Sequence, residues 1–419
     1  MSDPGIRRLR PGEQDAFIES VRIPFLDPVV EGAPEEPWVD RARRRTDPER
    51  SWVAEDRGRF VANCAIHSMD LTVPAPPGRP CPVVPMGGVT AVGVHPTHRR
   101  RGLLTRLMAE MLADCRRRGE PVAGLHASES AIYGRFGFGL ASQAATCTID
   151  SREARMLVPP PPLGLQFLGR GEAAKILPEL FDRQRRTRAG EVNRDAIRWE
   201  ELLADEPARR QGGKGAFIAA CDEGYVVYRA VESPGAWQRG SIVVEELRGM
   251  SAEVEAGLWK FVFDLDLADE VTAARRPVDE PLGWRLADPR QLRVTGTEDR
   301  LWLRILDVPA ALTARGYRLA GRLVLDVVAP PAGADPGDPA VGRWLLDAGP
   351  DGAVCGPAGA GRPADLRLDL TALGSLYLGA TAASSLAAAG RVEELTPGSL
   401  RVADGLLGTW PAPATGTGF

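Results

Sequence analysis

Residues 89–139 read VTAVGVHPTHRRRGLLTRLMAEMLADCRRRGEPVAGLHASESAIYGRFGFG. The segment 89–94 is rich in β-branched residues and a proline follows it closely, so it predicts a strand. Leucine and methionine side chains recur at helical spacing over 103–115, which predicts a helix that ends near Gly119. A second strand is expected at 121–127. A strand, a helix and a strand at this spacing predict a βαβ unit with parallel pairing, and therefore an α/β core.

The rest of the chain divides into two further blocks. Four consecutive prolines at 159–162 indicate a linker. Beyond them, a strand expected at 241–247 and a helix after Gly249 repeat the order of the first block without its arginine-glycine turn. A third block begins near residue 292 and mixes strands with helices, which indicates an α+β module. With boundaries near 155 and 290, we expect three domains, which are 1–155, 156–290 and 291–419.

The composition is that of an ordinary globular protein. Of the 419 residues, 44% are hydrophobic and 26% are charged, which excludes a mostly disordered chain and suits two to four domains. The formal net charge of −4 gives no reason to expect a nucleic-acid partner. The six cysteines form no CxxC pair and the four histidines all precede residue 127, so no metal site is expected. No secretory signal and no apolar run of the ~20 residues that a membrane span needs are visible, so we expect a soluble, cytoplasmic protein.

A basic turn lies between the first predicted strand and the helix. Arg99, Arg100 and Arg101 precede Gly102, whose missing side chain lets the backbone approach a ligand. The first N–H groups of a helix, together with three guanidinium groups, form a cradle suited to an anion such as pyrophosphate. An isolated turn of this kind also suits a solvated basic cap, so the surrounding motifs must decide between the two interpretations.

Those motifs resemble a known family. Arg99-x-x-Gly102-x-Leu104 matches, apart from Leu104 in place of a small residue, the turn with which acyl-CoA-dependent acetyltransferases of the GNAT superfamily hold the pyrophosphate of coenzyme A. The longer stretch resembles the enhanced-intracellular-survival (Eis) acetyltransferases of actinobacteria. The segments that carry this resemblance are 95–104, 127–129, 132–137, 301–312, 314–317 and 373–380.

The resemblance implies a fold and a co-substrate. The fold would be α/β and α+β, with two GNAT-like mixed-sheet acetyltransferase folds, the second lacking the cofactor turn, followed by a sterol-carrier-protein-like α+β domain. Acetyl-CoA would be the acetyl donor, and its pantetheine arm would pair with the main chain of the first strand as a further strand. The residues expected to contact it are Val92, Gly93, Val94, Arg100, Arg101, Gly102, Leu103, Leu104, Thr105, Ser128 and Glu129.

Acetylation of an amine by a thioester involves two proton transfers, one from the amine and one to the leaving thiolate. Tyr133 is the expected acid, because a reference pKa of about 10 keeps it protonated at neutral pH and the resemblance gives this tyrosine that role. It would lie on a short helix capped by one of the serines before it. The first strand carries no carboxylate at 90–94, so Glu129 is one candidate base. The resemblance implies instead the terminal carboxylate of Phe419.

The tail that carries this carboxylate, APATGTGF at 412–419, has the composition of a disordered end, although a terminal phenylalanine ring is also a natural anchor. The resemblance implies amine substrates, namely aminoglycosides acetylated at one or more amino groups. A polycationic sugar calls for carboxylates and aromatic rings, and Asp27 and Trp38 occupy the positions where the family supplies them. Gly418 stands where the family often has an acidic residue.

Two alternatives remain open at this point. The enzyme would acetylate protein lysines or arylalkylamines if its pocket lining differs from that of the family. In a different class, the chain would be a lipid-binding or scaffold protein that works through its third domain. The resemblance also implies a homohexamer.

Overall fold

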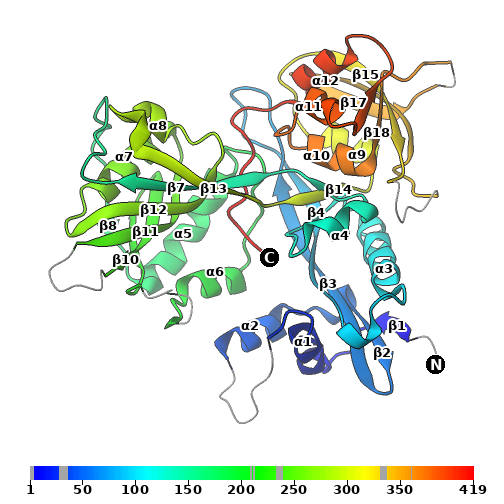
Figure 1. Cartoon of the computed structure of the whole chain (residues 1–419), viewed down its shortest axis with the longest axis horizontal. Helices are drawn as coiled ribbons and strands as arrows, with labels where there is room; N and C mark the ends of the chain where they lie inside the picture. The colour runs from blue at the N-terminus through cyan, green and yellow to red at the C-terminus, as the bar shows by residue number, and fades with distance from the viewer. Residues whose placement is uncertain are drawn as a thin grey trace. The chain divides into compact units, whose positions relative to one another are not determined.

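The computed structural model describes residues 4–27, 36–207, 210, 213–232, 239–330, 337–359 and 361–419. They form two compact units (Figure 1). One unit comprises Met1–Ala141, Leu301–Thr409 and Phe419, and the other comprises Ser142–Arg300 and Trp410–Gly418.

The first unit is built on a mixed sheet. Its strand order is β1 (Gly5–Arg8), β2 (Ser51–Asp56), β3 (Arg59–Thr72), β4 (Val83–Val94), β5 (Val122–Leu125), β14 (Trp302–Ile305) and β6 (Gly139–Leu140). β4 and β5 are parallel and α3 (Leu103–Arg117) connects them, which confirms the βαβ unit predicted from the sequence. The same unit contains α1 (Gln14–Arg22), α2 (Pro37–Arg45) and α4 (Ser130–Tyr133).

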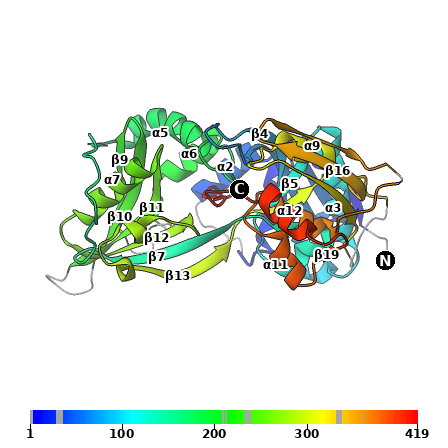
Figure 2. The same ribbon diagram turned by 90° about the horizontal axis from the view of Figure 1, so that it is seen from above.

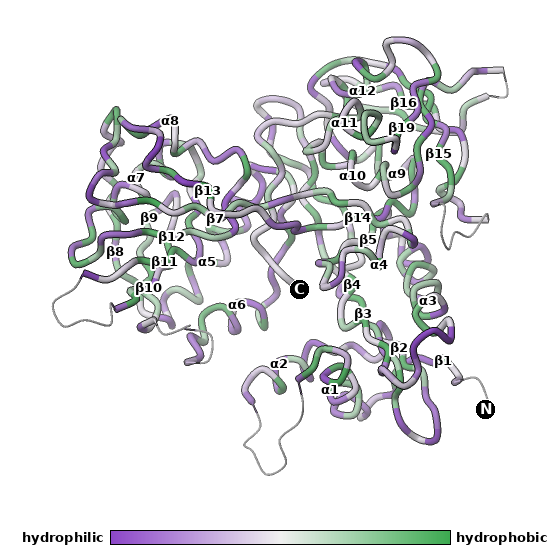
Figure 3. The backbone as a smooth tube through the Cα atoms, in the orientation of Figure 1, coloured by the Kyte–Doolittle hydropathy of each residue, from purple (hydrophilic) through white to green (hydrophobic). Residues whose placement is uncertain are grey.

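The apolar stripe of α3 explains why this helix forms where it does. Leu103, Leu107, Met108 and Met111 recur on one face and are buried against strand residues such as Ile66. Figure 3 shows hydrophobic residues recurring along α3 and the neighbouring strands. Full burial of each such side chain contributes roughly 1.5–3 kcal/mol, so α3 is fixed firmly against the sheet.

The first unit also carries a second, smaller sheet. Its strand order is β17 (Gly352–Pro357), β16 (Gly342–Gly349), β15 (Gly321–Val328), β18 (Leu366–Asp369) and β19 (Val392–Glu394), and its helices include α9 (Val308–Ala314), α10 (Leu370–Leu376), α11 (Ala383–Ala388) and α12 (Ser399–Leu407). α10 packs closely on the first sheet, because a Cβ on Gly374 would lie 2.1 Å from the carbonyl oxygen of Leu303 and a Cβ on Gly139 would lie 1.9 Å from that of Thr371. Two glycines therefore permit this contact.

The second unit repeats the strand-helix-strand order. Its strand order is β13 (Leu292–Asp299), β7 (Gln143–Asp150), β12 (Ala268–Pro277), β11 (Gly240–Gly249), β10 (Gly224–Val231), β9 (Phe217–Cys221) and β8 (Gln166–Phe167). β11 and β12 are parallel and α7 (Ala252–Phe263) connects them. Helices α5 (Arg170–Arg185), α6 (Ala196–Leu203) and α8 (Leu282–Arg285) belong to the same unit, and β7 and β13 run side by side in it (Figure 2).

Three strands lie in a different sheet from the one that the expected boundaries near 155 and 290 imply. β13 follows residue 290 but pairs with β7 in the sheet of the second unit. β7 precedes residue 155 but pairs with β12 and β13. β14 follows residue 290 but lies between β5 and β6. The chain therefore enters the second unit after Ala141 and leaves it after Arg300, and the proline run at 159–162 lies inside that unit. Strands whose partners lie this far away in the sequence carry no local signal of the pairing. Composition therefore does not reveal where the chain passes from one unit to the other.

Within the part of the chain that the structure describes, no helix combines the length and the apolarity needed to cross a bilayer.

Candidate active site

Strands β4 and β5 separate partway along their length. Their parallel pairing ends at Gly88 and Gly124, although β4 continues to Val94. Among the described residues, the main-chain N–H and C=O groups on this edge of β4 beyond Gly88 have no partner strand. An edge of this kind can accept an extended ligand as an additional strand.

A bulge in β4 sets the course of that edge. Ala91 has a φ of +51°, and the register between β3 and β4 shifts here. Nδ2 of the buried Asn63 donates a hydrogen bond of 2.5 Å to the carbonyl oxygen of Ala91. Because a bulge bends its strand and turns the residues that follow it, Asn63 helps to aim Val92, Gly93 and Val94.

The basic turn between β4 and α3 is exposed and has an open helix end. Arg100 has a φ of +63° and Gly102 a φ of +73°, and a glycine adopts this left-handed conformation without steric cost. Gly102 is the residue before α3, no side chain caps the helix, and a Cβ on Gly102 would meet nothing within 4 Å. The first N–H groups of α3 therefore remain available to an anion.

These features fit coenzyme A in charge and in backbone geometry. Arg100 and Arg101 are exposed beside the helix end, and Thr105 is exposed in the first turn of the helix. Leu103 points into the core and Leu104 is partly buried, so these two residues contribute backbone rather than side chain. The turn thus has the N–H groups and cations that a pyrophosphate needs, and the free edge of β4 has the alternating donors and acceptors that suit a pantetheine arm.

Tyr133 is the last residue of α4 and is buried. Its ring meets that of Phe138 edge to face, with 6.2 Å between the centroids. Burial raises the pKa of the phenol, the nearby charge of Glu129 acts in the same direction, and a hydrogen bond with the side chain of Ser128 opposes both. The net upward shift keeps the phenol protonated at neutral pH. Glu129 precedes the helix and no side chain caps it, so the predicted serine cap is wrong.

Phe419 lies where β4 and β5 separate. Its ring meets the imidazole of His126 edge to face, with 4.8 Å between the centroids and 66° between the planes. A Cβ on Gly88 would lie 3.1 Å from Cε2 of Phe419. Gly88 ends the pairing of β4 with β5, and His126 directly follows β5. The phenylalanine is therefore anchored by its ring, although the surrounding composition is typical of a free end.

Asp27 and Trp38 are brought together by Arg22. The carboxylate of Asp27 is 3.1 Å from Nε of Arg22, and the guanidinium carbon of Arg22 lies 5.2 Å from the centroid of the Trp38 ring. Pro24 in the same segment lies against β4, since a Cβ on Gly93 would be 2.8 Å from its Cγ. The segment thus lies against the last part of β4, and the carboxylate of Asp27 pairs with Arg22 but remains 48% exposed.

The equivalent turn of the second unit has a closed helix end. α7 follows β11 as α3 follows β4, but the hydroxyl of Ser251 accepts a hydrogen bond of 3.3 Å from the N–H of Val254. The hydroxyl of Ser251 thus already accepts a helix N–H group that a bound anion would require. The sequence around this turn also lacks the three arginines of the first turn.

Three residues of this region escaped the reasoning from sequence. Asn63 supports the bulge, while Gly88 and His126 hold the ring of Phe419. The Gly87-Gly88 pair is a visible signal, because a glycine inside a strand often marks the close approach of another group. Asn63 and His126 have no such signal, since each owes its contact to a strand or a chain end that is remote in sequence.

Comparison with known proteins places these features in a family. Three family models match the chain: a GNAT acetyltransferase domain over residues 5–141, a second GNAT acetyltransferase domain over 190–305, and a sterol carrier protein domain over 308–415. The two GNAT matches coincide with the two parallel strand-helix-strand units. The third match covers the smaller sheet of the first unit.

Relatives and a solved structure agree with these models over most of the chain. An uncharacterized N-acetyltransferase of Streptomyces avermitilis is 37% identical over 431 residues, which cover 98% of this chain and 97% of the relative. The N-acetyltransferase Eis of Mycobacterium bovis is 38% identical over 340 residues, 80% of each chain. The crystal structure of Eis1 from Mycobacterium abscessus superposes with a TM-score of 0.84 at 31% identity and covers 99% of this chain and 100% of that one. The chain therefore belongs to the Eis family of GNAT N-acetyltransferases.

Proposed function

We propose that this enzyme transfers the acetyl group of acetyl-CoA to amino groups of aminoglycoside-type polyamines. Tyr133 serves as the general acid and the terminal carboxylate of Phe419 as the general base. The observation that carries the proposal is the packing of the Phe419 ring on His126 and Gly88, because it holds the last residue at the point where the β4 edge becomes free.

The binding residues act by position and charge. The main chain of Val92, Gly93 and Val94 pairs with the pantetheine arm, and Ser128 and Glu129 border the same ligand. The amides of 103–105 with the guanidinium groups of Arg100 and Arg101 bind the pyrophosphate at the end of α3. Bound acetyl-CoA supplies the acetyl thioester.

The terminal carboxylate and one side chain move the protons. The Phe419 carboxylate accepts the proton that the attacking amine must lose, and the phenol of Tyr133 donates its proton to the sulfur that departs. The raised pKa of Tyr133 suits this role, because the group stays protonated throughout the neutral range. Asp27 and Trp38 receive a cationic, ring-shaped substrate through charge and stacking.

The test is acetyl-CoA turnover with aminoglycosides, simple amines and a lysine peptide. Tyr133→Phe removes the proton donor but keeps the ring, so we expect kcat to fall about 10²-fold or more. An added glycine after Phe419 moves the terminal carboxylate by about 3.5 Å and should lower kcat comparably. Tyr228→Phe is the matched control, since this buried tyrosine stacks on Phe217 in the other unit.

Wild-type turnover in both site variants would overturn the acid and base assignments. Turnover of the lysine peptide or of simple amines in preference to every aminoglycoside would overturn the substrate class while leaving the acetyltransferase chemistry intact. The oligomeric state that the resemblance implies, a homohexamer, is a separate proposal that sedimentation velocity tests.

A further inference from the structure

The segment before Phe419 is held almost residue by residue within the second unit. The N–H of Ala412 donates to Asp279 (2.7 Å), and the carbonyl of Ala412 accepts from Arg188 (2.9 Å). The hydroxyl of Thr415 donates to the carbonyl of Gly190 (2.7 Å), and Thr415 and Thr417 are 1% and 2% exposed. A segment of small residues whose composition is typical of a disordered end is thus held by hydrogen bonds along most of its length.

Glu191 makes the tightest part of this attachment. It is 2% exposed, and its two carboxylate oxygens accept the N–H groups of Gly416 at 3.0 Å and Thr417 at 3.1 Å. Hydrogen bonds from main-chain N–H groups to a charged carboxylate are about twice as strong as neutral ones. Because the two N–H groups belong to consecutive residues, one carboxylate fixes both the position and the register of the tail.

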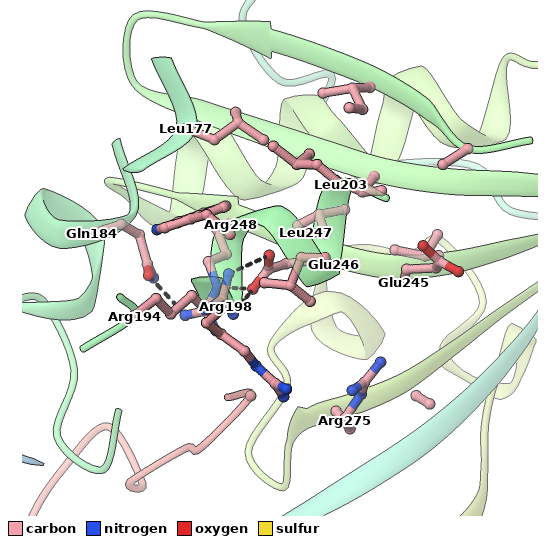
Figure 4. A pocket seen from close by; sticks show the side chains of 18 of the residues that line it. Leu177, Gln184, Arg194, Arg198, Leu203, Glu245, Glu246, Leu247, Arg248 and Arg275 are labelled. Atoms are coloured by element: carbon pink, nitrogen blue, oxygen red, sulfur yellow. Dashed lines mark hydrogen bonds and ion pairs between the residues drawn. The ribbon is translucent and has the colours of Figure 1, made fainter. Parts of the chain in front are cut away.

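Arginines keep this carboxylate charged. Arg248 pairs with Glu191, and Arg194 donates from Nε to the hydroxyl of Thr417 at 2.8 Å. Burial disfavours the charged form of Glu191, but the positive charges of Arg248 and Arg194 outweigh burial and hold its pKa below the usual value. Glu246 in turn pairs with both arginines, and Figure 4 shows this group from close by.

The attachment occupies the place where the second unit's own strands separate. The parallel pairing of β11 with β12 ends at Val244 and Ala273, and Glu246 and Arg248 follow on β11 beyond that point. Gly416 passes so close to Arg248 that a Cβ on it would lie 2.5 Å from Nη2. In the first unit the equivalent separation is the proposed pantetheine site. In the second unit, where Ser251 closes the helix end, the same feature holds the chain's own tail.

We propose that Glu191 is a positioning residue for acetyl transfer: by fixing residues 416–417 it sets where the carboxylate of Phe419 lies. Only Gly418 separates Thr417 from Phe419, and two residues of extended chain span about 7 Å at most, so a register fixed at Thr417 restricts the terminal carboxylate closely. This inference rests on the proposed role of Phe419 as the base. It also gives the second GNAT domain a task other than binding acetyl-CoA.

The experiment compares Glu191→Gln with wild type in the full chain, by two independent measurements. Hydrogen exchange of the C-terminal peptide reports the attachment, and loss of the two charge-assisted bonds should speed exchange of the Gly416 and Thr417 amides about tenfold or more. Steady-state kinetics report the positioning. We expect kcat to fall while the KM for acetyl-CoA stays the same, because that ligand's proposed cradle lies in the first unit.

The pH profile separates positioning from general damage. Without a positioned base, turnover depends on amine that is already deprotonated in solution, so the deficit of Glu191→Gln should shrink as the pH approaches the pKa of the substrate amine. Asp205→Asn is the matched control, since Asp205 is also buried and pairs with Arg229 without a hydrogen bond to the described tail. It should leave both the exchange of the tail and the pH profile unchanged.

The outcomes distinguish this inference from the function on which it rests. Unchanged exchange at Gly416 and Thr417 overturns the attachment by Glu191, whatever the activity. Faster exchange with an unchanged kcat overturns the positioning role of Glu191 alone, because the contacts of the Phe419 ring with His126 and Gly88 remain, and the added glycine after Phe419 then tests the base separately. Faster exchange with a lower kcat and a pH-dependent deficit supports both.

Discussion

Single residues at the separation of β4 and β5 limit what the site can contain. Gly88 has Met69 on one side and the ring of Phe419 on the other, so its lack of a side chain is a condition for the terminal ring to lie there. His126 supplies the second contact. The position of the proposed base thus depends on the missing side chain of Gly88 and on the ring of His126.

Gly88→Ala is therefore expected to displace the ring. The added Cβ would lie 2.5 Å from Sδ of Met69 and 3.1 Å from Cε2 of Phe419, and overpacking of this kind costs about 1–3 kcal/mol of stability. We expect kcat to fall about tenfold or more because a 1 Å misplacement of a catalytic group can cost as much as 10². Gly296→Ala, where a Cβ would meet nothing within 4 Å, is the control. Equal kcat values for the two variants would contradict this account.

At the scale of elements, two helices with the same topological place differ at their first turn. α3 begins after a left-handed glycine with no side-chain cap, whereas α7 begins after Ser251, whose hydroxyl accepts the N–H of Val254. An uncapped helix end is a cost in the free protein, and a bound anion offsets it.

Ser251→Ala should lower the stability of the second unit by about 1 kcal/mol, because the N-cap hydrogen bond is lost. The KM for acetyl-CoA should not change, since the proposed cofactor turn lies in α3. Denaturant unfolding followed by tryptophan fluorescence and steady-state kinetics are the two measurements. An increase in KM comparable to that caused by Gly102→Ala, whose left-handed φ a side chain strains, would show that α7 also serves the cofactor.

The sequence predicted the elements around the cofactor turn well, because their signals are local. The strand 89–94, the helix 103–115 and the strand 121–127 correspond to the end of β4, to α3 and to β5. The assignment of β7 and β14 to their sheets was not predictable, since partners lie more than a hundred residues away. Likewise, a local motif singles out Tyr133 as a candidate, whereas the contacts of Glu191 with the tail join two segments that are far apart in the sequence and carry no motif.

At the scale of the whole chain, the sterol-carrier-like domain is bound to the first GNAT domain through a shared carboxylate. Oδ2 of Asp338 lies 2.6 Å from the guanidinium groups of both Arg116 and Arg304. Arg304 is almost fully buried, and burial lowers its pKa to about 10 even though Asp338 opposes the shift. The buried guanidinium group of Arg304 is therefore stabilised by the carboxylate of Asp338.

Asp338→Asn should therefore destabilise the first unit by about 3 kcal/mol, the scale seen when one partner of a buried ion pair is removed. The exposed pair Arg322–Asp347 provides the control, and Asp347→Asn should cost less than about 1 kcal/mol. Thermal and denaturant unfolding measure both. Similar losses in the two variants would mean that Asp338 contributes no more than a surface charge.

Buried thiols make the fold sensitive to alkali. Burial raises the pKa of Cys64, Cys115 and Cys147 above the ordinary value of 9.0, that of Cys147 to about 11. Above pH 9 the unfolded chain loses thiol protons that the folded chain keeps, so the free energy of unfolding should fall as the pH rises, by about 1.4 kcal/mol per pH unit for each such thiol. Urea midpoints between pH 8 and 10.5 measure this slope. Cys147→Ala should make it shallower, and an unchanged slope in that variant would contradict the assignment.

The place of β14 has a consequence for how the molecule is made. On the ribosome, β5 and β6 emerge long before Trp302–Ile305, the strand that lies between them, and residues Ser142–Arg300 of the second unit are synthesised in the interval. Until β14 has been made, the first sheet lacks one strand and β5 has an unpaired edge. Chaperones shield edges of this kind from aggregation. Each chain can therefore become an active acetyltransferase only late in its synthesis.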